Sequence, residues 1–430
     1  MSGGKDSCVL LDLIAEFSRS NNEKQIYVLH FDHGIQEQSK QWSVFCEKLC
    51  QKYGFDFISI RSEVEVDTSI GLEASARNSR YLWFRDVMQQ KLNKDQSLQH
   101  AVLITAHHSD DQAETILMNI LRGTGIKGLR GIAEKKQIFG NGQDTHNVIR
   151  PLLSFSQDQI DDYAQEKKLE WCEDPSNQDT GFRRNAIRHL VLPELKKIRP
   201  DTVSQFQKLS QRAADAHNLL NDIAISDLAL TDNFDWFLLD ESYALSLEGI
   251  RGLSIARQLN AIKTWLDLIQ FPAESETDLL QVLDWSINGA NSGAEIRRGQ
   301  RIYRYFQNVF YVMPLSQSNP DLLFKETLLW PDTRTPFLFD YSGAQQEKWK
   351  ICCHESSDYF AKSVKLYPST HINEILLPGG SGHIKAKQSY QQEKVPTWRR
   401  IRSLFVTNEA GEFIGIIGGQ KLQDFYFDKA

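Results

Sequence analysis

Two short stretches contain the residue types that phosphate chemistry would need, and the first lies at the beginning of the sequence. It reads Ser2-Gly-Gly-Lys-Asp-Ser7, with two glycines flanked by hydroxyls and a carboxylate, and an apolar run from Val9 to Ile14 follows. This order indicates a glycine turn leading into a helix, whose N–H groups and dipole can bind phosphate. The spacing excludes a Walker A loop and a G-x-G-x-x-G turn. A turn that only caps an ordinary helix is the alternative.

The second stretch, residues 105–115, contains two adjacent histidines followed by three acidic residues. Ser109 and Gln112 have the S-x-x-Q spacing of a capping box, which predicts a helix beginning at Ser109. Two aspartates then fall in the first turn, and the second, Asp111, shares a helix face with Glu114. Such a carboxylate pair could hold Mg²⁺ or a substrate ammonium. The alternative is that the acids only complement the helix dipole.

Alternating strands and helices must position these two stretches. Short β-branched and aromatic runs predict strands at residues 25–33, 55–60 and 101–106, and apolar periodicity predicts helices at residues 7–18, 39–53, 73–90 and 109–122. This alternation indicates an α/β fold, a doubly wound and mostly parallel sheet with helices on both faces. Ligands bind such sheets at the carboxyl ends of the strands, where the glycine turn and both histidine pairs would meet.

One strand of this arrangement is missing from the expected order. A doubly wound unit has a strand before its phosphate-binding turn, and here only Met1 precedes Ser2. We therefore expect either that the true start of the protein lies upstream or that the sheet lacks one central strand. The first of these two readings is favoured.

Composition sets further bounds on the class of protein. The chain has 430 residues, 41% of them apolar, and a net charge of −7, which suits a globular protein that is not basic overall. No apolar run is long enough to span a membrane and no secretory signal is visible, so we expect a cytoplasmic protein without a membrane partner. The six cysteines include no C-x-x-C pair, which disfavours a zinc ribbon or a redox dithiol.

Three domains are expected along the chain. Residues 1–200 contain the α/β pattern, and Pro200 precedes a long helical stretch that begins at Val203. Residues 201–315 are expected to form a helical middle domain. Residues 316–430 alternate strand-like runs with glycines and are expected to form a small α+β domain, with 316–320 as a linker.

Several motifs resemble those of known enzymes. The glycine turn resembles the S-G-G-x-D-S loop of the PP-loop ATP pyrophosphatases, whose fold is adenine nucleotide alpha hydrolase-like and which cleave ATP between the α and β phosphates. Further stretches resemble the tRNA(Ile)-lysidine synthetases, which use ATP and free lysine to convert an anticodon cytidine of an isoleucine tRNA to lysidine. These stretches are His30–Gly34, Glu73–Tyr81, His107–Gly131, Arg150–Leu153, Trp171–Asn177 and Arg184–Arg188. Together the motifs cover residues 2–195.

The resemblance implies where ATP and its magnesium ion bind. The phosphates would lie in the glycine turn, and Asp6 would help to hold Mg²⁺ across them. Two histidines would lie beside the nucleotide, although a structural role is equally open for each. The residues assigned to ATP are Ser2, Gly3, Gly4, Lys5, Asp6, Ser7, His33 and His107.

The resemblance also implies a lysine site and catalytic groups. Asp111 and Glu114 would bind L-lysine and could help to deprotonate its amine. Arg77 and Arg184 would neutralise the α-phosphate and the adenylated intermediate, unless they form structural salt bridges instead. The residues assigned to catalysis are Asp6, Arg77, Asp111, Glu114 and Arg184.

Basic residues indicate where a tRNA(Ile) with a CAU anticodon would bind. Three of them lie in the glycine-containing segment 122–131, and others surround the K-x-P-x-W-x-R spacing near residue 398, which resembles the family's C-terminal tRNA-binding domain. An exposed Trp398 could stack on a base, and the alternative is that it belongs to the core. The middle domain would help to select the tRNA. The residues assigned to tRNA are Arg122, Lys127, Arg130, Trp398, Arg399 and Arg400.

Three alternative functions each require features that can be checked in the sequence. The tRNA 2-thiolation enzymes share the S-G-G-K-D-S loop, but they use a C-x-x-C pair that is absent here. A glutamine-dependent amidotransferase would need a glutaminase domain, and none is visible. A non-catalytic tRNA-binding protein stays open, as does the choice between a monomer and a homodimer. Release of AMP that depends on tRNA and lysine separates an enzyme from a binding protein.

Overall fold

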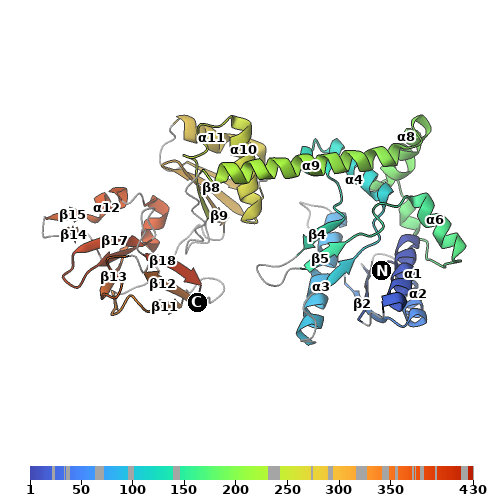
Figure 1. Ribbon diagram of the computed structural model, residues 1–430, viewed down its shortest axis with the longest axis horizontal. Helices are drawn as coiled ribbons and strands as arrows, with labels where there is room; N and C mark the ends of the chain where they lie inside the picture. Colours follow the sequence, from blue (N-terminus) through green and yellow to red (C-terminus); the bar gives the residue numbers. More distant parts are fainter. Residues whose placement is uncertain are drawn as a thin grey trace. The chain divides into compact units, whose positions relative to one another are not determined.

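The computed structural model describes most of the chain, in ranges separated by gaps (Figure 1). These ranges are 1–21, 25–32, 34, 39–62, 72–94, 101–138, 146–230, 243–272, 275–288, 294–315, 327–340, 348–353, 357–369, 372, 374–377, 382–392, 395–417 and 425–429. The predicted linker at 316–320 and most of the turn-rich stretch 140–147 lie outside them, as does His33.

The chain divides into two compact units, Met1–Asn218 and Leu219–Ala430. The division falls within α9 (Thr202–Leu228), a helix that was expected to begin near Val203. The separation of residues 201–315 from 316–430 stays a prediction. No described helix is long and apolar enough to cross a membrane.

The first unit alternates strands and helices, as the sequence pattern predicts. Its strands are β1 (Tyr27–Asp32), β2 (Asp56–Arg61), β3 (Val102–Ile104), β4 (Lys135–Ile138) and β5 (His146–Ile149). Its helices are α1 (Lys5–Asn21), α2 (Ser39–Tyr53), α3 (Leu72–Lys94), α4 (Ser109–Leu121), α5 (Ile126–Leu129), α6 (Gln157–Glu166), α7 (Arg183–Ala186) and α8 (Leu192–Ile198), followed by α9. The predicted helices over 7–18, 39–53, 73–90 and 109–122 are therefore confirmed with small changes at their ends.

Helices cover both faces of these strands. Leu29 of β1, Leu103 of β3 and Val148 of β5 pack against Phe84 and neighbouring side chains of α3. The adjacent Val28 packs against Leu11 of α1 and Cys50 of α2. Because successive strand residues point to opposite faces, α3 covers one face and α1 with α2 the other. This is the doubly wound arrangement expected from the sequence.

The described strands of this unit pair in two separate sheets. β1 and β2 form a parallel pair, while β5 pairs with β3 in parallel and with β4 in antiparallel orientation. Met1 also contacts β1: its N-terminus donates to the Leu29 carbonyl, and its own carbonyl oxygen lies 2.9 Å from Nδ1 of His30. Within the described ranges no strand connects β1 to β3.

The second unit contains two further groups of elements after the C-terminal part of α9. The first group is β6 (Tyr243–Ser246), α10 (Ile255–Leu268), α11 (Glu276–Asn288), β7 (Glu295–Arg298), β8 (Arg301–Phe306) and β9 (Val309–Pro314), with the sheet order β6-β9-β8-β7. The second group is β10 (Leu328–Trp330), β11 (Phe337–Asp340), β12 (Lys348–Cys353), β13 (Val364–Pro368), β14 (Glu374–Leu376), β15 (His383–Lys385), α12 (Ala386–Gln392), β16 (Leu404–Thr407), β17 (Phe413–Ile417) and β18 (Phe425–Lys429). Its described sheets are β10-β13-β16-β17, β11-β12-β18 and β14-β15.

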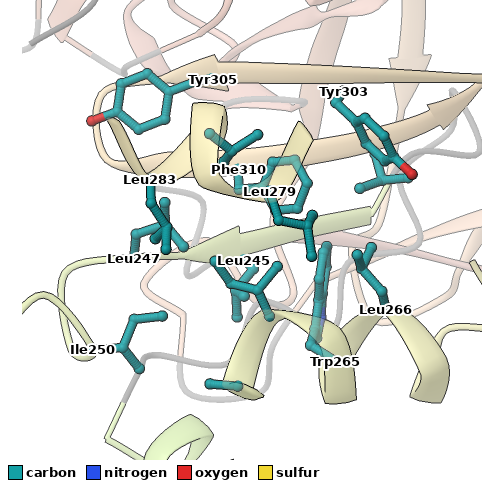
Figure 2. Packing of buried hydrophobic residues seen from close by; sticks show 14 of the residues in the cluster. Leu245, Leu247, Ile250, Trp265, Leu266, Leu279, Leu283, Tyr303, Tyr305 and Phe310 are labelled. Carbon is teal, nitrogen blue, oxygen red and sulfur yellow. The ribbon is translucent and has the colours of Figure 1, made fainter. Parts of the chain in front are cut away.

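The middle segment is more than the helical domain expected from the sequence. Helix α10 packs Trp265 and Leu266 against the antiparallel sheet, where Leu245 of β6 and Phe310 of β9 are fully buried (Figure 2). The strands of this sheet were not predicted, because the segment is rich in Trp and Leu and shows no clear alternation of apolar and polar residues. The segment therefore has a hydrophobic core that is formed by both helices and strands. The C-terminal strands and α12 agree with the α+β region expected there.

Candidate active site

The glycine turn folds into a compact loop at the N-terminus of α1. The Gly4 amide donates to Ser2 Oγ at 3.3 Å, and Ser7 Oγ donates to the Gly4 carbonyl at 2.8 Å. The two serine hydroxyls lie 3.2 Å apart. The first amides of α1 have no acceptor within the helix, so this loop combines hydroxyls with helix N–H donors. Such a set of donors suits a phosphate.

The loop requires glycine at position 3 because of both its backbone and its packing. Gly3 has a φ of +89°, which other residues rarely adopt. A Cβ atom there would also lie 3.3 Å from Sγ of Cys46 in α2. The Gly3 carbonyl accepts from the Cys172 amide at 2.9 Å and from Cys8 Sγ at 3.4 Å. Burial raises the pKa of the Cys8 and Cys46 thiols to about 12, so both thiols are uncharged at neutral pH and pack against the loop.

Lys5 points away from the loop, towards α6. Its Nζ donates to Asp161 at 3.0 Å and lies 5.0 Å from the centre of the Trp171 ring. Asp161 therefore binds the ammonium group that the family resemblance assigns to ATP. A contact between Lys5 and a phosphate would require the side chain to leave Asp161.

Asp6 is the acidic residue of the loop and remains partly accessible. Its side chain is 38% exposed, and its Oδ1 accepts from Gln157 Nε2 at 3.2 Å. His108 Nε2 lies 3.9 Å from the other oxygen. Gln157 also donates from its side chain to Asp161 and from its backbone to Asp110 Oδ2, so it connects the glycine loop with α4. The carboxylate of Asp6 is therefore held in place within the glycine loop.

Helix α4 begins at Ser109 as predicted, but its cap differs from the expected one. The backbone amide of His108, the N-cap residue, donates to Asp111 Oδ2 at 3.0 Å. The proposed Ser109–Gln112 capping box is thus wrong by one residue. Gln112 instead accepts from the Ile132 amide and donates to Ser210 Oγ at 2.6 Å, which fixes the turn after α5.

Asp111 and Glu114 do share one helix face, and two arginines neutralise them. Arg184 donates from Nε to Glu114 and from its terminal nitrogen to Asp111, both at 2.6 Å. Arg188 donates to Glu114 through two nitrogens at 2.5 and 3.0 Å and approaches Asp111 Oδ1 at 3.3 Å. The Glu114 side chain is only 1% exposed. Two carboxylates and two guanidinium groups therefore form one cluster, which we call the carboxylate–arginine cluster.

The two adjacent aspartates of α4 have different partners. Burial alone would raise the pKa of Asp111, but the neighbouring His108 and Arg184 hold that pKa below its usual value. Asp110 is likewise buried, and its pKa is lowered by Lys196 at 2.7 Å and by the Gln157 amide. Asp111 thus belongs to the cluster, while Asp110 connects α4 to α6 and α8.

Two histidines lie at the start of α4. His107 Nδ1 is 2.9 Å from Thr105 Oγ1, and burial lowers the pKa of His107 to about 4, with a further contribution from Arg150. His108 is almost fully buried, and its Nε2 lies 3.4 Å from Asp111 as well as 3.9 Å from Asp6. The His108 ring therefore lies between Asp6 of the glycine loop and the carboxylate–arginine cluster.

The low pKa of His107 predicts how the stability of the protein depends on pH. Unfolded His107 takes up a proton below about pH 6.5, whereas the folded residue does so only near pH 4. The free energy of unfolding should therefore fall as the pH drops through this window, by about 2 kcal/mol at pH 5 from this residue. Chemical denaturation at pH 7, 6 and 5 measures this slope. His107→Asn should flatten it, and an unchanged slope in that variant would contradict the assignment.

Arg77 and the basic residues after α4 lie at the surface of the same unit. The exposed Arg77 guanidinium is 5.2 Å from the Tyr81 ring centre, and its positive charge contributes to the lowered pKa of His107. Arg122 and Lys127 are exposed and Arg130 is half-buried, next to exposed Leu121 and Ile126. Contact of these three basic residues with tRNA stays a prediction.

Trp398 lies against other aromatic rings rather than fully in solvent. Its ring makes edge contacts with Phe306 and Tyr311, and the Arg304 guanidinium is 4.9 Å from its centre. Arg400 stacks on Tyr390. The side chain of Arg399 lies outside the described part of the structure. The structure therefore favours the core reading of Trp398, and stacking on a base would require it to leave these partners.

Sequence reasoning missed four contributors to this site, Gln157, His108, Arg188 and Lys196. Arg188 carries the clearest signal, since it follows Arg184 by four residues and so shares its helical face. The backbone there passes from α7 into a π-helical turn at Ile187–Val191, a feature frequent at functional sites. Gln157 and Lys196 come from helices far along the chain and have no local signal.

Comparisons with known proteins identify the class of the first unit. Residues 1–195 match the family model of the PP-loop domain. The first unit is therefore an α/β domain of the PP-loop class, which uses ATP. A solved U34-tRNA thiolase from Methanococcus maripaludis is 17% identical, with a TM-score of 0.38 over 49% of this chain and 69% of that one.

Curated relatives define the family within this class. The tRNA(Ile)-lysidine synthase of Hydrogenovibrio crunogenus is 30% identical over 97% of this chain and 92% of its own length. That of Haemophilus ducreyi is 30% identical over 94% and 90%, and that of Pseudomonas syringae is 37% identical over 62% and 56%. The chain belongs to the tRNA(Ile)-lysidine synthase family.

Proposed function

We propose that this protein joins L-lysine to C2 of the anticodon wobble cytidine of an isoleucine tRNA with a CAU anticodon, at the expense of ATP. Membership of the tRNA(Ile)-lysidine synthase family supports ATP-dependent lysidine formation on tRNA(Ile). One observation within the fold supports the chemistry in particular. The phosphate loop and the carboxylate–arginine cluster lie on either side of His108, so an anionic and a cationic substrate can bind side by side.

The reaction would proceed in two balanced steps. The O2 atom of cytidine attacks the α-phosphorus of ATP, a bond from O2 to phosphorus forms, and pyrophosphate leaves. The lysine ε-nitrogen then attacks C2, loses a proton, and the C2–O2 bond breaks as AMP leaves. Adenylation is needed because a carbonyl oxygen is a poor leaving group, whereas AMP is a good one.

The glycine loop would bind the nucleotide. The hydroxyls of Ser2 and Ser7 and the amides at the start of α1 would donate to the β- and γ-phosphates. Arg77 and Arg184 would move onto the α-phosphate, where a guanidinium suits the charge that develops. Neutral His107 would lie beside the nucleotide.

The donor set around Asp6 fits a magnesium ion that is bound together with phosphates. Among the described residues no group of three or more His, Cys, Asp or Glu side chains could hold a metal ion. Mg²⁺ commonly takes only one or two protein carboxylates and completes its shell with phosphates and water. Asp6 would supply that carboxylate, and the ion would neutralise phosphate charge.

Asp111 and Glu114 would bind the lysine ammonium. Both are rigidly placed carboxylates on one face of α4, and Glu114 is buried. A deprotonated carboxylate in this position can accept the proton that the amine loses on attack. The exposed residues Arg122 and Lys127, with Arg130, would contact the tRNA backbone, helped by Arg399 and Arg400 of the C-terminal region.

The direct test is incorporation of labelled lysine. The full chain is incubated with ATP, Mg²⁺, labelled L-lysine and a tRNA(Ile) transcript with a CAU anticodon, and tRNA-bound lysine and AMP are measured. We expect both products in equal amounts, and neither with a transcript in which the wobble cytidine is replaced by uridine. Tight tRNA binding without AMP or bound lysine would instead favour a non-catalytic tRNA-binding protein.

A further inference from the structure

The carboxylates assigned to lysine are already occupied in the structure. Asp111 and Glu114 make ion pairs with Arg184 and Arg188 at 2.5 to 3.3 Å. Both carboxylate oxygens of Glu114 accept at least one hydrogen bond from these arginines, and so does Oδ1 of Asp111. A lysine ammonium therefore cannot pair with these oxygens unless an arginine moves.

The two sides of the cluster differ in their freedom to move. The side chains of Glu114 and Asp111 are 1% and 11% exposed, whereas those of Arg184 and Arg188 are 27% and 35% exposed. Asp111 is additionally fixed by the amide of His108. The arginines are long side chains on the short α7 and the π-helical turn after it, so they are the members that can leave.

A phosphate group can compete with the two carboxylates for these arginines. A guanidinium binds a phosphate through two parallel hydrogen bonds, as it binds a carboxylate. His108 links the cluster to Asp6 and the phosphate loop, so an ATP bound there lies next to it. When both arginines turn to phosphates, each exchanges one anionic partner for another, and a buried carboxylate is left without a cation. That carboxylate then needs a new cation, because an unpaired buried charge is costly.

We propose that Arg184 and Arg188 make lysine binding depend on the presence of nucleotide phosphate. Without phosphate the arginines occupy the lysine site, and with phosphate they release Asp111 and Glu114 to the lysine ammonium. This inference rests on the proposed function and adds that nucleotide binding promotes lysine binding. Arg188 is thereby a positioning residue that acts through the two carboxylates, and nucleotide and lysine bind with positive coupling.

Calorimetric titration of the full-length protein with L-lysine tests the coupling. It is performed with Mg²⁺ alone and with Mg²⁺ and saturating α,β-methylene-ATP, which cannot be cleaved between the α and β phosphates. We expect the lysine affinity to rise by about 10-fold or more with the analogue, and the analogue affinity to rise by the same factor with lysine. Equal lysine affinities under the two conditions would overturn the proposal.

Substitutions at the arginines assign the coupling to them. In Arg188→Gln, lysine should bind more tightly than to wild type without nucleotide, and the effect of the analogue should shrink to about 3-fold or less. Arg188→Lys keeps a charge without the planar fork and should give an intermediate coupling. Arg183→Gln is the matched control, since Arg183 is exposed on the same helix and lies outside the cluster, and it should retain the wild-type coupling.

The outcomes separate this inference from the proposed function. Wild-type coupling in Arg188→Gln, with unfolding temperature showing that the variant is folded, would refute the role of the arginines. Lysine incorporation into tRNA together with nucleotide-independent lysine affinity would refute the coupling and leave the function standing. No lysine binding even with nucleotide and tRNA would instead refute the proposed function.

Discussion

Replacement of Asp6 by alanine is expected to slow AMP formation by about 10²–10³-fold, because a fixed charge beside the reacting phosphates is lost. The backbone of the glycine loop should persist, since its hydrogen bonds come from Ser2, Gly4 and Ser7 and alanine is a good helix former. Binding of tRNA should be nearly unchanged. The rate is measured as AMP released at saturating ATP, lysine and tRNA, and tRNA affinity is measured separately.

A matched control distinguishes the carboxylate of Asp6 from a general effect of charge. Asp158 is an exposed acid in the first turn of α6, close in type and helix position to Asp6 in α1. Asp158→Ala should keep AMP formation within about 2-fold of wild type, since exposed charges contribute little. Loss of tRNA binding in Asp6→Ala would indicate misfolding, and near-normal AMP formation in that variant would remove Asp6 from the catalytic set.

Glu114→Gln should have the largest effect on stability. Glu114 is 1% exposed and receives hydrogen bonds from Arg184 and Arg188, so its replacement leaves two guanidinium groups with one remaining carboxylate. Breaking a buried ion pair on one side costs about 3–5 kcal/mol. We expect the free energy of unfolding to fall by about this amount in urea denaturation. Lysine incorporation should also be lost in the fraction that remains folded.

An exposed glutamate provides the comparison. Glu194 pairs with Lys197 at the surface, with side chains 64% and 71% exposed. Glu194→Gln should change the free energy of unfolding by less than about 1 kcal/mol. If Glu114→Gln were no more destabilising than Glu194→Gln, the carboxylate–arginine cluster would not be a stabilising part of the folded state.

Local sequence patterns correctly predicted those features of the fold that depend on only a few neighbouring residues. The glycine turn, the start of α4 at Ser109 and the shared face of Asp111 and Glu114 follow from spacing over a few residues. The alternation of strands and helices also predicted the doubly wound first unit. These features depend on backbone preferences and periodicity, which one segment contains by itself.

The remaining features depend on partners that are distant in sequence. Arg184 lies 70 residues from Glu114, and Lys5 meets an acid 156 residues away. No local pattern could show that Lys5 would turn to α6 or that Trp398 would pack on β8 and β9. The capping error has a similar cause, because the Gln112 side chain bonds to Ile132 and Ser210, which lie 20 and 98 residues away.

The two oxygens of Asp111 have separate tasks, and this separation bears on how the site exchanges its cation. Oδ2 holds the first turn of α4 through the His108 amide, while Oδ1 accepts from the arginines. A cation can therefore be exchanged at Oδ1 while the helix end stays closed. Such an exchange needs rotation of the arginine side chains and no rearrangement of the backbone of α4. We expect the site to change from its resting to its loaded form without opening of the first turn of α4.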